Sequence, residues 1–378
     1  MPNLIVSTCG TSLLTNQCKD QERRNSLNRL SNKREDDLHA SEKELIDNEL
    51  QNAERLLDET LELNDLRKRS AEINTILGIY DNHIALGKDD YHLLLHTDTY
   101  EGKRTAMLLE NWLRRYEIQQ VELHCCEKLN TSNSRNFQLG IANLATYLAK
   151  TLPRWKEQRY KVIFQLSGSF KSLQGFMQTA GMFYADEIVY IFETSSEVIR
   201  IPQMPIDLNA AALKIVADNL HLFRLFERQK GIVPKQEAEA LSGLDLGMFV
   251  EMDDELAALT AWGILCWERA KEKLYSEKLL DSPHNEIVYG PKFAESAQNC
   301  CTSDYQRRVL NERIDDFATF LDHGAHIKRL DHKQLKGNPV PPSTHECDVW
   351  DEYRIFMHQE NNAWLLDKLA LGLHKNKK

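Results

Sequence analysis

The stretch Leu4-Ile5-Val6-Ser7-Thr8-Cys9-Gly10-Thr11-Ser12, near the start of the chain, decides the fold class. An apolar run that ends in a polar, glycine-containing loop predicts a buried β-strand followed by a loop. The pattern then repeats, with strands expected at 91–96, 120–124, 161–166, 187–192 and 196–201, and helices at 103–116, 136–150 and 172–184. This alternation predicts an α/β fold with a mostly parallel, doubly wound sheet. Such a sheet binds ligands at the carboxyl ends of its strands.

The composition limits the classes of function. The 378 residues allow two or three domains, and the net charge of −10 gives no overall basic surface for nucleic acid. Eight cysteines without CxxC spacing indicate reduced thiols in a cytoplasmic protein. We expect no signal peptide, no membrane span, no cofactor and no metal site, because the chain lacks an apolar leader, an HExxH motif and a carboxylate cluster suited to Mg²⁺.

Three regions are expected along the chain. The first is a ligand domain at 1–204, interrupted at about 18–77 by one or two charged amphipathic helices that either cover the sheet or dock a partner. A helical, winged-helix-like connector is expected at 205–283, after Pro202 and Pro205. The last region, 284–378, runs from strand to helices and then to several strands, which predicts a small α+β domain.

The polar loops of the first region have the chemistry of a phosphate site. Hydroxyls follow the first strand, Gly10 permits close approach of a ligand, and Ser167-Gly168-Ser169-Phe170-Lys171 opens a helix. Neither loop is a P-loop or a GxGxxG motif, so an ATPase or a dinucleotide enzyme is not indicated. By spacing alone, an ordinary loop with a helix cap remains an equal alternative.

The loops together resemble the CARF sensor domains of CRISPR-associated proteins, through Ser-Thr-Cys-Gly-Thr-Ser at 7–12, Thr-Asp-Thr-x-Glu-Gly at 97–102 and Ser-Gly-Ser-Phe-Lys at 167–171. The resemblance implies a Rossmann-like domain that binds cyclic oligoadenylate, most often cyclic tetra-adenylate, across the axis of a homodimer. The residues that it places at the ligand are Thr8, Gly10, Thr11, Ser12, Thr99, Gly168 and Lys171. Some CARF domains also cut their ligand slowly without metal, through residues that resemble Ser12 and Lys171.

The end of the chain collects basic residues beside strand-like runs. Lys and Arg neutralise phosphate, and a His or a Lys of lowered pKa moves the proton of a 2′-hydroxyl, so the segment reads as a metal-independent ribonuclease. Simpler interpretations stay open: Lys333 and Lys336 as solvated residues of a strand edge, and Arg354 as an ion pair with Asp351 or Glu352. His332, His345 and His358 are expected to be bystanders.

Residues 284–378 are similar to the RelE toxin fold, through 291–294, 305–321, Lys333-x-x-Lys336-Gly337, Tyr353-Arg354 and Gly372-Leu373-His374-Lys375. The resemblance implies cleavage of mRNA in the ribosomal A site by attack of the 2′-hydroxyl on its own phosphate. The catalytic residues that it implies are Lys333, Lys336, Arg354, His374 and Lys375. The family's common C-terminal tyrosine is absent here, and His or Lys stands in place of its arginine, which leaves the general base open.

Together the two resemblances imply an endoribonuclease of type III CRISPR defence that a cyclic oligoadenylate activates through the connector. An acidic enzyme is expected to reach the ribosome through a ribosomal protein, with 18–77 or 207–280 as candidate docking faces. The alternatives are a ligand-sensing transcriptional regulator, which the acidic residues of 207–280 disfavour, and a stand-alone ring nuclease.

Overall fold

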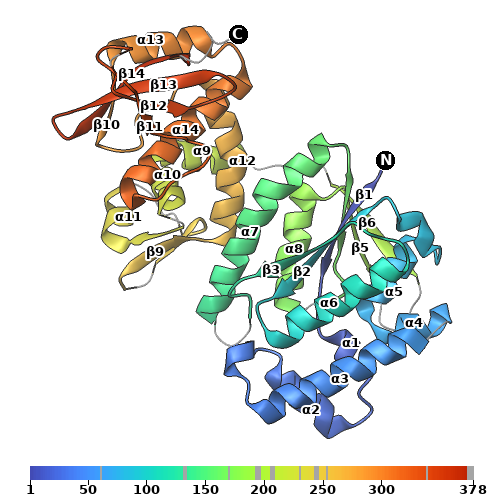
Figure 1. Cartoon of the computed structure of the whole chain (residues 1–378). Coiled ribbons are helices and arrows are strands. Elements are labelled where there is room, and N and C mark those ends of the chain that lie inside the picture. Colours follow the sequence, from blue (N-terminus) through green and yellow to red (C-terminus); the bar gives the residue numbers. More distant parts are fainter. Residues whose placement is uncertain are drawn as a thin grey trace. The chain divides into compact units, whose positions relative to one another are not determined.

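The chain divides into two compact units, Met1–Asp207 and Leu208–Lys378, in the computed structural model (Figure 1). The structure describes residues 1–59, 62–130, 134–168, 171–191, 197–204, 209–229, 231–241, 247–252, 254–337 and 339–372. The division lies close to the predicted end of the ligand domain at 204. The further predicted boundary at 283 stays a prediction.

The first unit is built on a six-stranded sheet of order β3-β2-β1-β4-β5-β6. The strands are β1 (Asn3–Thr8), β2 (Tyr91–Thr97), β3 (Val121–Cys126), β4 (Lys161–Gln165), β5 (Glu187–Ile191) and β6 (Val198–Pro202). All neighbours pair in parallel except β5 and β6, which form the expected antiparallel pair. The prediction of a mostly parallel sheet is confirmed, and the connections reverse direction between β1 and β4.

Helices cover both faces of this sheet. They are α1 (Ser12–Thr15), α2 (Gln21–Leu30), α3 (Ala40–Glu59), α4 (Leu63–Arg69), α5 (Ala71–Ile79), α6 (Tyr100–Arg115), α7 (Ser134–Glu157) and α8 (Lys171–Tyr184), with short 3₁₀ turns at Glu35–Asp37 and Ile84–Gly87. The prediction of one or two helices at 18–77 is wrong in number, because α2 to α5 are four separate helices. The expected loop at 97–102 is shorter than predicted, since Thr99 caps α6 and the helix already begins at Tyr100.

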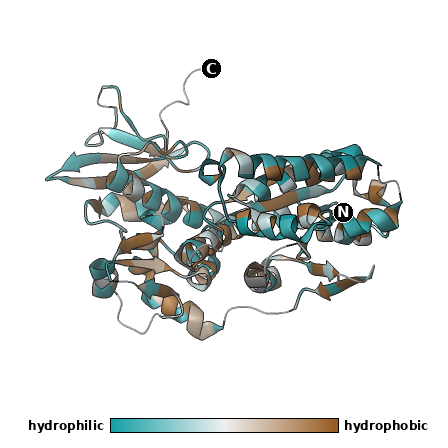
Figure 2. Ribbon diagram, turned by 90° about the horizontal axis from the view of Figure 1, so that it is seen from below, coloured by the Kyte–Doolittle hydropathy of each residue, from teal (hydrophilic) through white to brown (hydrophobic). Residues whose placement is uncertain are grey.

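The inserted helices do cover the sheet. Ile5, Leu94, Ile163 and Val189 of the strands pack in one hydrophobic cluster with buried residues of α1 to α6. Hydrophobic and hydrophilic residues share these helices in Figure 2, as expected for helices that bury one side. The first of the two interpretations of 18–77, a cover on the sheet, is therefore what the packing supports.

The second unit begins with helices and a small sheet. Its first elements are α9 (Ala210–Asp218), α10 (Leu220–Arg228), β7 (Ile232–Pro234), α11 (Lys235–Leu241), β8 (Val250–Met252), β9 (Leu256–Leu259) and α12 (Ala261–Glu277). The strands pair antiparallel in the order β7-β9-β8. These strands of three or four residues were not predicted, because runs so short carry too few positions to display a two-residue period.

A five-stranded sheet of order β10-β14-β13-β12-β11 follows. The elements are β10 (Ile287–Tyr289), α13 (Pro291–Cys300), α14 (Asp304–His323), β11 (Lys333–Gln334), β12 (His345–Asp348), β13 (Tyr353–Glu360) and β14 (Ala363–Leu371). Only β10 is parallel to its neighbour, so the antiparallel strands at the end of the chain are confirmed. The small α+β character is as predicted, and the RelE-like identity stays a prediction.

A buried charge cluster connects helices α10, α12 and α14 of this unit. Arg224 is 1% exposed and donates from Nε to Asp315 Oδ1 at 2.9 Å and from Nη1 to the carbonyl of Asp281 at 2.6 Å. The hydroxyl of Tyr275 donates to the same carboxylate. Since an unpaired charge in a protein interior is costly, each member of this cluster requires the others.

Replacing Asp315 by Ala should lower the free energy of unfolding by about 3–5 kcal/mol, because it leaves the guanidinium of Arg224 buried without its counter-charge. The control is Glu272→Ala, which breaks the exposed pair with Arg308 and should cost about 1 kcal/mol or less. Both variants are measured by urea unfolding of the full chain. Equal losses for the two variants would contradict this account of the cluster.

Candidate functional site

A polar cavity lies at the carboxyl ends of β1 and β4, where the connections of the sheet reverse direction. Open α/β sheets bind their ligands at this position. The cavity has a volume of about 660 Å³. Its lining combines the loops after both strands with residues of the inserted helices: Cys9, Gly10, Thr11, Ser12, Thr15, Asn16, Ser31, Asn32, Arg67, Lys68, Ala71, Asn74, Thr97, Gly102, Ser167, Gly168 and Ile191.

Four of the seven predicted ligand residues line this cavity: Gly10, Thr11, Ser12 and Gly168. Thr8 is fully buried in β1, and Thr99 is 2% exposed. The hydroxyl of Thr99 accepts a hydrogen bond from the backbone of Gly102 at 3.2 Å, so it caps α6 instead of lining the cavity. Lys171 begins α8, but its side chain lies outside the described residues.

Glu72 organises the wall of this cavity, and it was not predicted from the sequence. Its Oε1 accepts the backbone N–H of Gly10 at 2.7 Å, and its Oε2 accepts the hydroxyl of Ser12 at 2.6 Å. Ser70, which caps α5, also donates its hydroxyl to Oε2. The side chain is buried, with 2% of the residue exposed. A carboxylate therefore occupies the donors that the sequence analysis assigned to a phosphate.

This carboxylate explains one of the two loop glycines. A Cβ on Gly168 would lie 1.9 Å from Glu72 Oε1, so any side chain there would displace the carboxylate from its present position. A Cβ on Gly10 would lie 3.4 Å from the backbone of Gly168 and 3.5 Å from Glu72 Oε1, which is ordinary van der Waals contact. Gly168 thus makes room for the side chain of Glu72.

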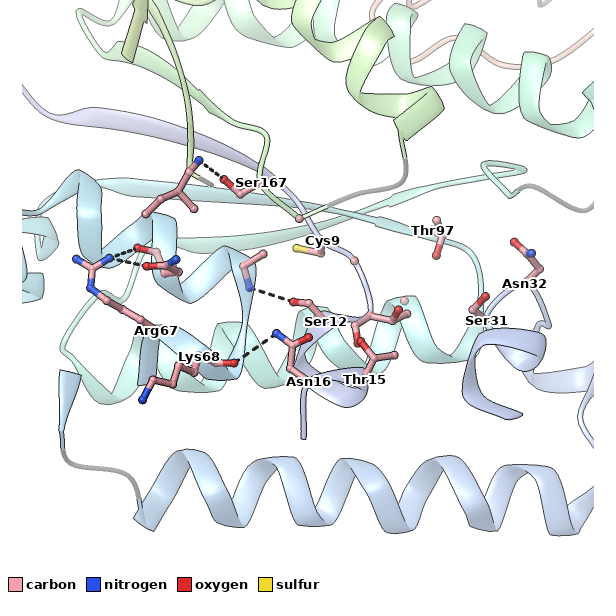
Figure 3. A pocket seen from close by; sticks show the side chains of 17 residues that line it. Cys9, Ser12, Thr15, Asn16, Ser31, Asn32, Arg67, Lys68, Thr97 and Ser167 are labelled. Atoms are coloured by element: carbon pink, nitrogen blue, oxygen red, sulfur yellow. Dashed lines mark hydrogen bonds between the residues drawn. The ribbon is translucent and has the colours of Figure 1, made fainter. Parts of the chain in front are cut away.

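The remaining lining is mainly neutral and polar, with two cations at one side. Figure 3 shows Ser12 and Asn16 of the first loop beside Arg67 and Lys68 of α4. Arg67 is held in place by Asn74 and Asn82, and burial lowers the pKa of its guanidinium from the ordinary value. The amide of Asn16 donates to the carbonyl of Lys68 at 3.4 Å. Hydroxyls, amides and cations in this arrangement suit the ribose, base and phosphate of a nucleotide.

Another buried carboxylate lies in the first turn of α6, next to the cavity residue Gly102. Glu101 is 1% exposed, and burial raises its pKa to about 8. Among the described residues neither of its oxygens has a hydrogen-bond partner. Its carboxyl is therefore largely protonated at neutral pH.

In the second unit, two of the predicted basic residues, Lys333 and Arg354, are paired with carboxylates. Lys333 in β11 bonds Asp331 at 2.6 Å, and this hydrogen bond raises the pKa of the lysine. Arg354 in β13 pairs through Nε with Asp348 at 2.7 Å, whereas the sequence had suggested Asp351 or Glu352. Lys336 is exposed after β11. A lysine of raised pKa holds its proton, so Lys333 is suited to binding phosphate and not to removing a proton.

The other predicted residues of this unit divide into three cases. His374 and Lys375 lie outside the described residues. His332 and His345 stack on each other beside Trp364, and burial lowers the pKa of His332 to about 4, so both are partly buried packing residues. His358, taken as a bystander from the sequence, is held by a carboxylate instead.

Two further observations concern the described part of the chain. Among the described residues, no group of three or more His, Cys, Asp or Glu side chains is arranged to hold a metal ion. None of the helices in that part of the chain combines the length and the apolar character that crossing a membrane requires.

Part of the chain resembles a known protein family. Residues 67–204 match the family model of a CRISPR-associated protein (Cas_APE2256). The matched segment is a little more than a third of the chain, and it runs from the cavity residues of α4 to the end of the first unit. The match supports the interpretation of this chain as a CRISPR-associated protein, which the sequence had suggested.

Proposed function

We propose that this protein is an endoribonuclease of type III CRISPR defence that a cyclic oligoadenylate activates. The ligand binds in the polar cavity of the first unit, and the second unit cuts mRNA by attack of a 2′-hydroxyl, without a metal ion. The observation that carries the proposal is the cavity itself, since it lies at the reversal point of the sheet and borders the segment that matches a CRISPR-associated family. The site of action is the cytoplasm.

The size of the cavity supports a ligand shared between two copies of the chain. About 660 Å³ is the volume of a pocket for one drug-sized molecule. Cyclic tetra-adenylate, a ring of nucleotides, is larger than one such pocket. A homodimer would present two equivalent cavities to a symmetric ring. The proposal extends to slow cleavage of the ring, with Ser12 and Lys171 as the residues that take part.

The acidity of the chain supports delivery of RNA by another component. With a net charge of −10, the protein lacks the general attraction to phosphate that lets a nuclease bind free RNA non-specifically. We therefore place the cleavage on the ribosome, reached through a ribosomal protein, so that cutting of mRNA inhibits translation. Lys333, Lys336 and Arg354 supply the local positive charge at the substrate.

Glu72 leads to a prediction about the ligand. Glu72→Gln keeps the size of the side chain but removes a negative charge beside a polyanionic ring, so cyclic tetra-adenylate should bind about tenfold more tightly or better. The measurement is the Kd by calorimetry. The matched control is Glu44→Gln, an exposed carboxylate of the inserted helices, which should leave the Kd unchanged. Unchanged or weaker binding by the Glu72 variant would show that the carboxylate does not oppose the ring.

The nuclease half is tested with translating ribosomes and with naked RNA, each with and without cyclic tetra-adenylate. We expect cuts only on ribosomes with the ring present. Arg354→Ala should slow them by about 10²–10³-fold while the ring still binds, because a positive charge at the reacting phosphate is lost. The control is Arg308→Ala, which removes a partly exposed arginine paired with Glu272 in the same unit, and this variant should cut normally.

The other outcomes of this assay each have a meaning. Ring-dependent cuts on naked RNA would retain the ribonuclease and remove the ribosome from the proposal. No cuts under any condition, with the ring bound or degraded, would favour a ligand-sensing regulator or a stand-alone ring nuclease. Normal cutting by the Arg354 variant would remove this residue from the site.

A further inference from the structure

Residues of β13 alternate between the two faces of the five-stranded sheet in the second unit. On the face opposite the core cluster Phe356 is buried, with 1% of the residue exposed, whereas Arg354, His358 and Lys368 are partly exposed. Ile355 and Met357 of β13 point into the core cluster. Since side chains alternate along a strand, Arg354, Phe356 and His358 project from the opposite side. We call this side, with Asp367 and Lys368 of β14, the outer face of the sheet.

A β-bulge brings a carboxylate to this face. Phe356 pairs with Lys368, but the next residue, Met357, pairs with Leu366, so Asp367 is an extra residue in β14. A bulge of this kind breaks the alternation and redirects a side chain. As a result, Asp367 and Lys368 both reach the outer face: Lys368 lies over the ring of Phe356, with its ammonium 5.6 Å from the ring centre.

The redirected carboxylate holds His358. Nδ1 of His358 lies 3.0 Å from both oxygens of Asp367, and the hydroxyl of Ser343 donates to Asp367 Oδ2 at 2.7 Å. The side chains of His358 and Asp367 are 17% and 15% exposed, so the pair is sheltered but within reach of solvent. With Nδ1 facing a carboxylate, the ring is fixed in the tautomer that carries its proton on Nδ1 and leaves Nε2 as an acceptor.

The other ring nitrogen is turned to a different environment. Nε2 of His358 lies 3.9 Å from Glu360 Oε2, which is beyond hydrogen-bond distance. The side chain of Glu360 is 58% exposed. The serine cannot be a nucleophile activated by this histidine, because its hydroxyl donates to the carboxylate and not to the imidazole. The arrangement is therefore a histidine oriented by a carboxylate, as in general-base sites.

The same face carries cationic groups that could bind a phosphate. Arg354, Phe356 and His358 occupy alternate positions of β13, each about 6–7 Å from the next. Lys368 lies beside the middle residue of the three, Phe356. A phosphate near Lys368 would thus lie between Arg354 and the imidazole.

We propose that His358 is the general base of RNA cleavage by this chain, with Asp367 as its positioning residue and Lys368 as a phosphate-binding residue. This inference rests on the proposed ribonuclease function and names the group that performs it. Nε2 takes the proton of a ribose 2′-hydroxyl while the 2′-oxygen bonds to the adjacent phosphorus. The bond from phosphorus to the 5′-oxygen breaks, and the 5′-oxygen takes a proton from water. The imidazolium, stabilised by Asp367, returns its proton to solvent, leaving a 2′,3′-cyclic phosphate and a 5′-hydroxyl.

The test uses the full chain with cyclic tetra-adenylate and the RNA substrate, on ribosomes or free, that the wild type cuts. His358→Ala should lower kcat about 10²-fold or more, with KM changed only a few-fold, because the base acts in the chemical step. Added imidazole should restore part of the activity of this variant and none to Arg354→Ala. Asp367→Asn should lower kcat at least tenfold, since the amide no longer fixes the tautomer and orientation of the imidazole.

The controls separate chemistry from folding. His326→Ala, an exposed histidine of the same unit, should cut as the wild type does. Each variant is checked for its thermal unfolding midpoint and for binding of cyclic tetra-adenylate. If His358→Ala is unstable, His358→Gln, which keeps a hydrogen bond to Asp367, must show the same loss of kcat.

The outcomes distinguish this inference from the proposed function. If the wild type and His326→Ala cut RNA but a folded His358 variant cuts within threefold of them, His358 is not the base and the ribonuclease stands. The absence of rescue by imidazole, with a full loss of activity, would make His358 a structural residue. If the wild type with bound ring cuts no RNA, the proposed function fails and the role of His358 fails with it.

Discussion

A single buried carboxylate, Glu72, defines the shape of the candidate ligand site. Through Gly10 and Ser12 it attaches α5 to the loop after the first strand, and Gly168 must lack a side chain to make space for it. The inserted helices are thereby part of the site and not only a cover on the sheet. Because the carboxylate is paired with three donors, its burial is tolerated, and it lies behind Gly10 and Ser12, which line the cavity.

Much of the fold could be predicted from the sequence, because hydrophobic periodicity is strong where elements are long. The strands at 91–97 and 161–165 and the helix at 304–323 were recovered almost to their ends. The misses have a common cause. β7, β8 and β9 are three or four residues long, and residues 18–77 contain no Gly or Pro to mark the ends of their helices.

The candidate sites were harder to predict, since they depend on partners distant in sequence. Ser70 before an apolar run could have been recognised as a helix cap, but nothing local places Glu72 against Gly10, 62 residues away. In the same way, the bulge that turns Asp367 toward His358 is a property of strand pairing and not of composition. Lys333 and Arg354 lie on strands of the sheet, and their carboxylate partners Asp331 and Asp348 were not foreseen.

The central claim is that a cyclic oligoadenylate binds at the carboxyl ends of β1 and β4. The most direct measurement is backbone hydrogen exchange of the full chain with and without saturating cyclic tetra-adenylate, followed by peptide mapping. With cyclic tetra-adenylate bound, we expect slower exchange in residues 9–16 and in α4 and α5, which form the cavity wall. Slower exchange confined to other parts of the chain, or none at all, would contradict the central claim.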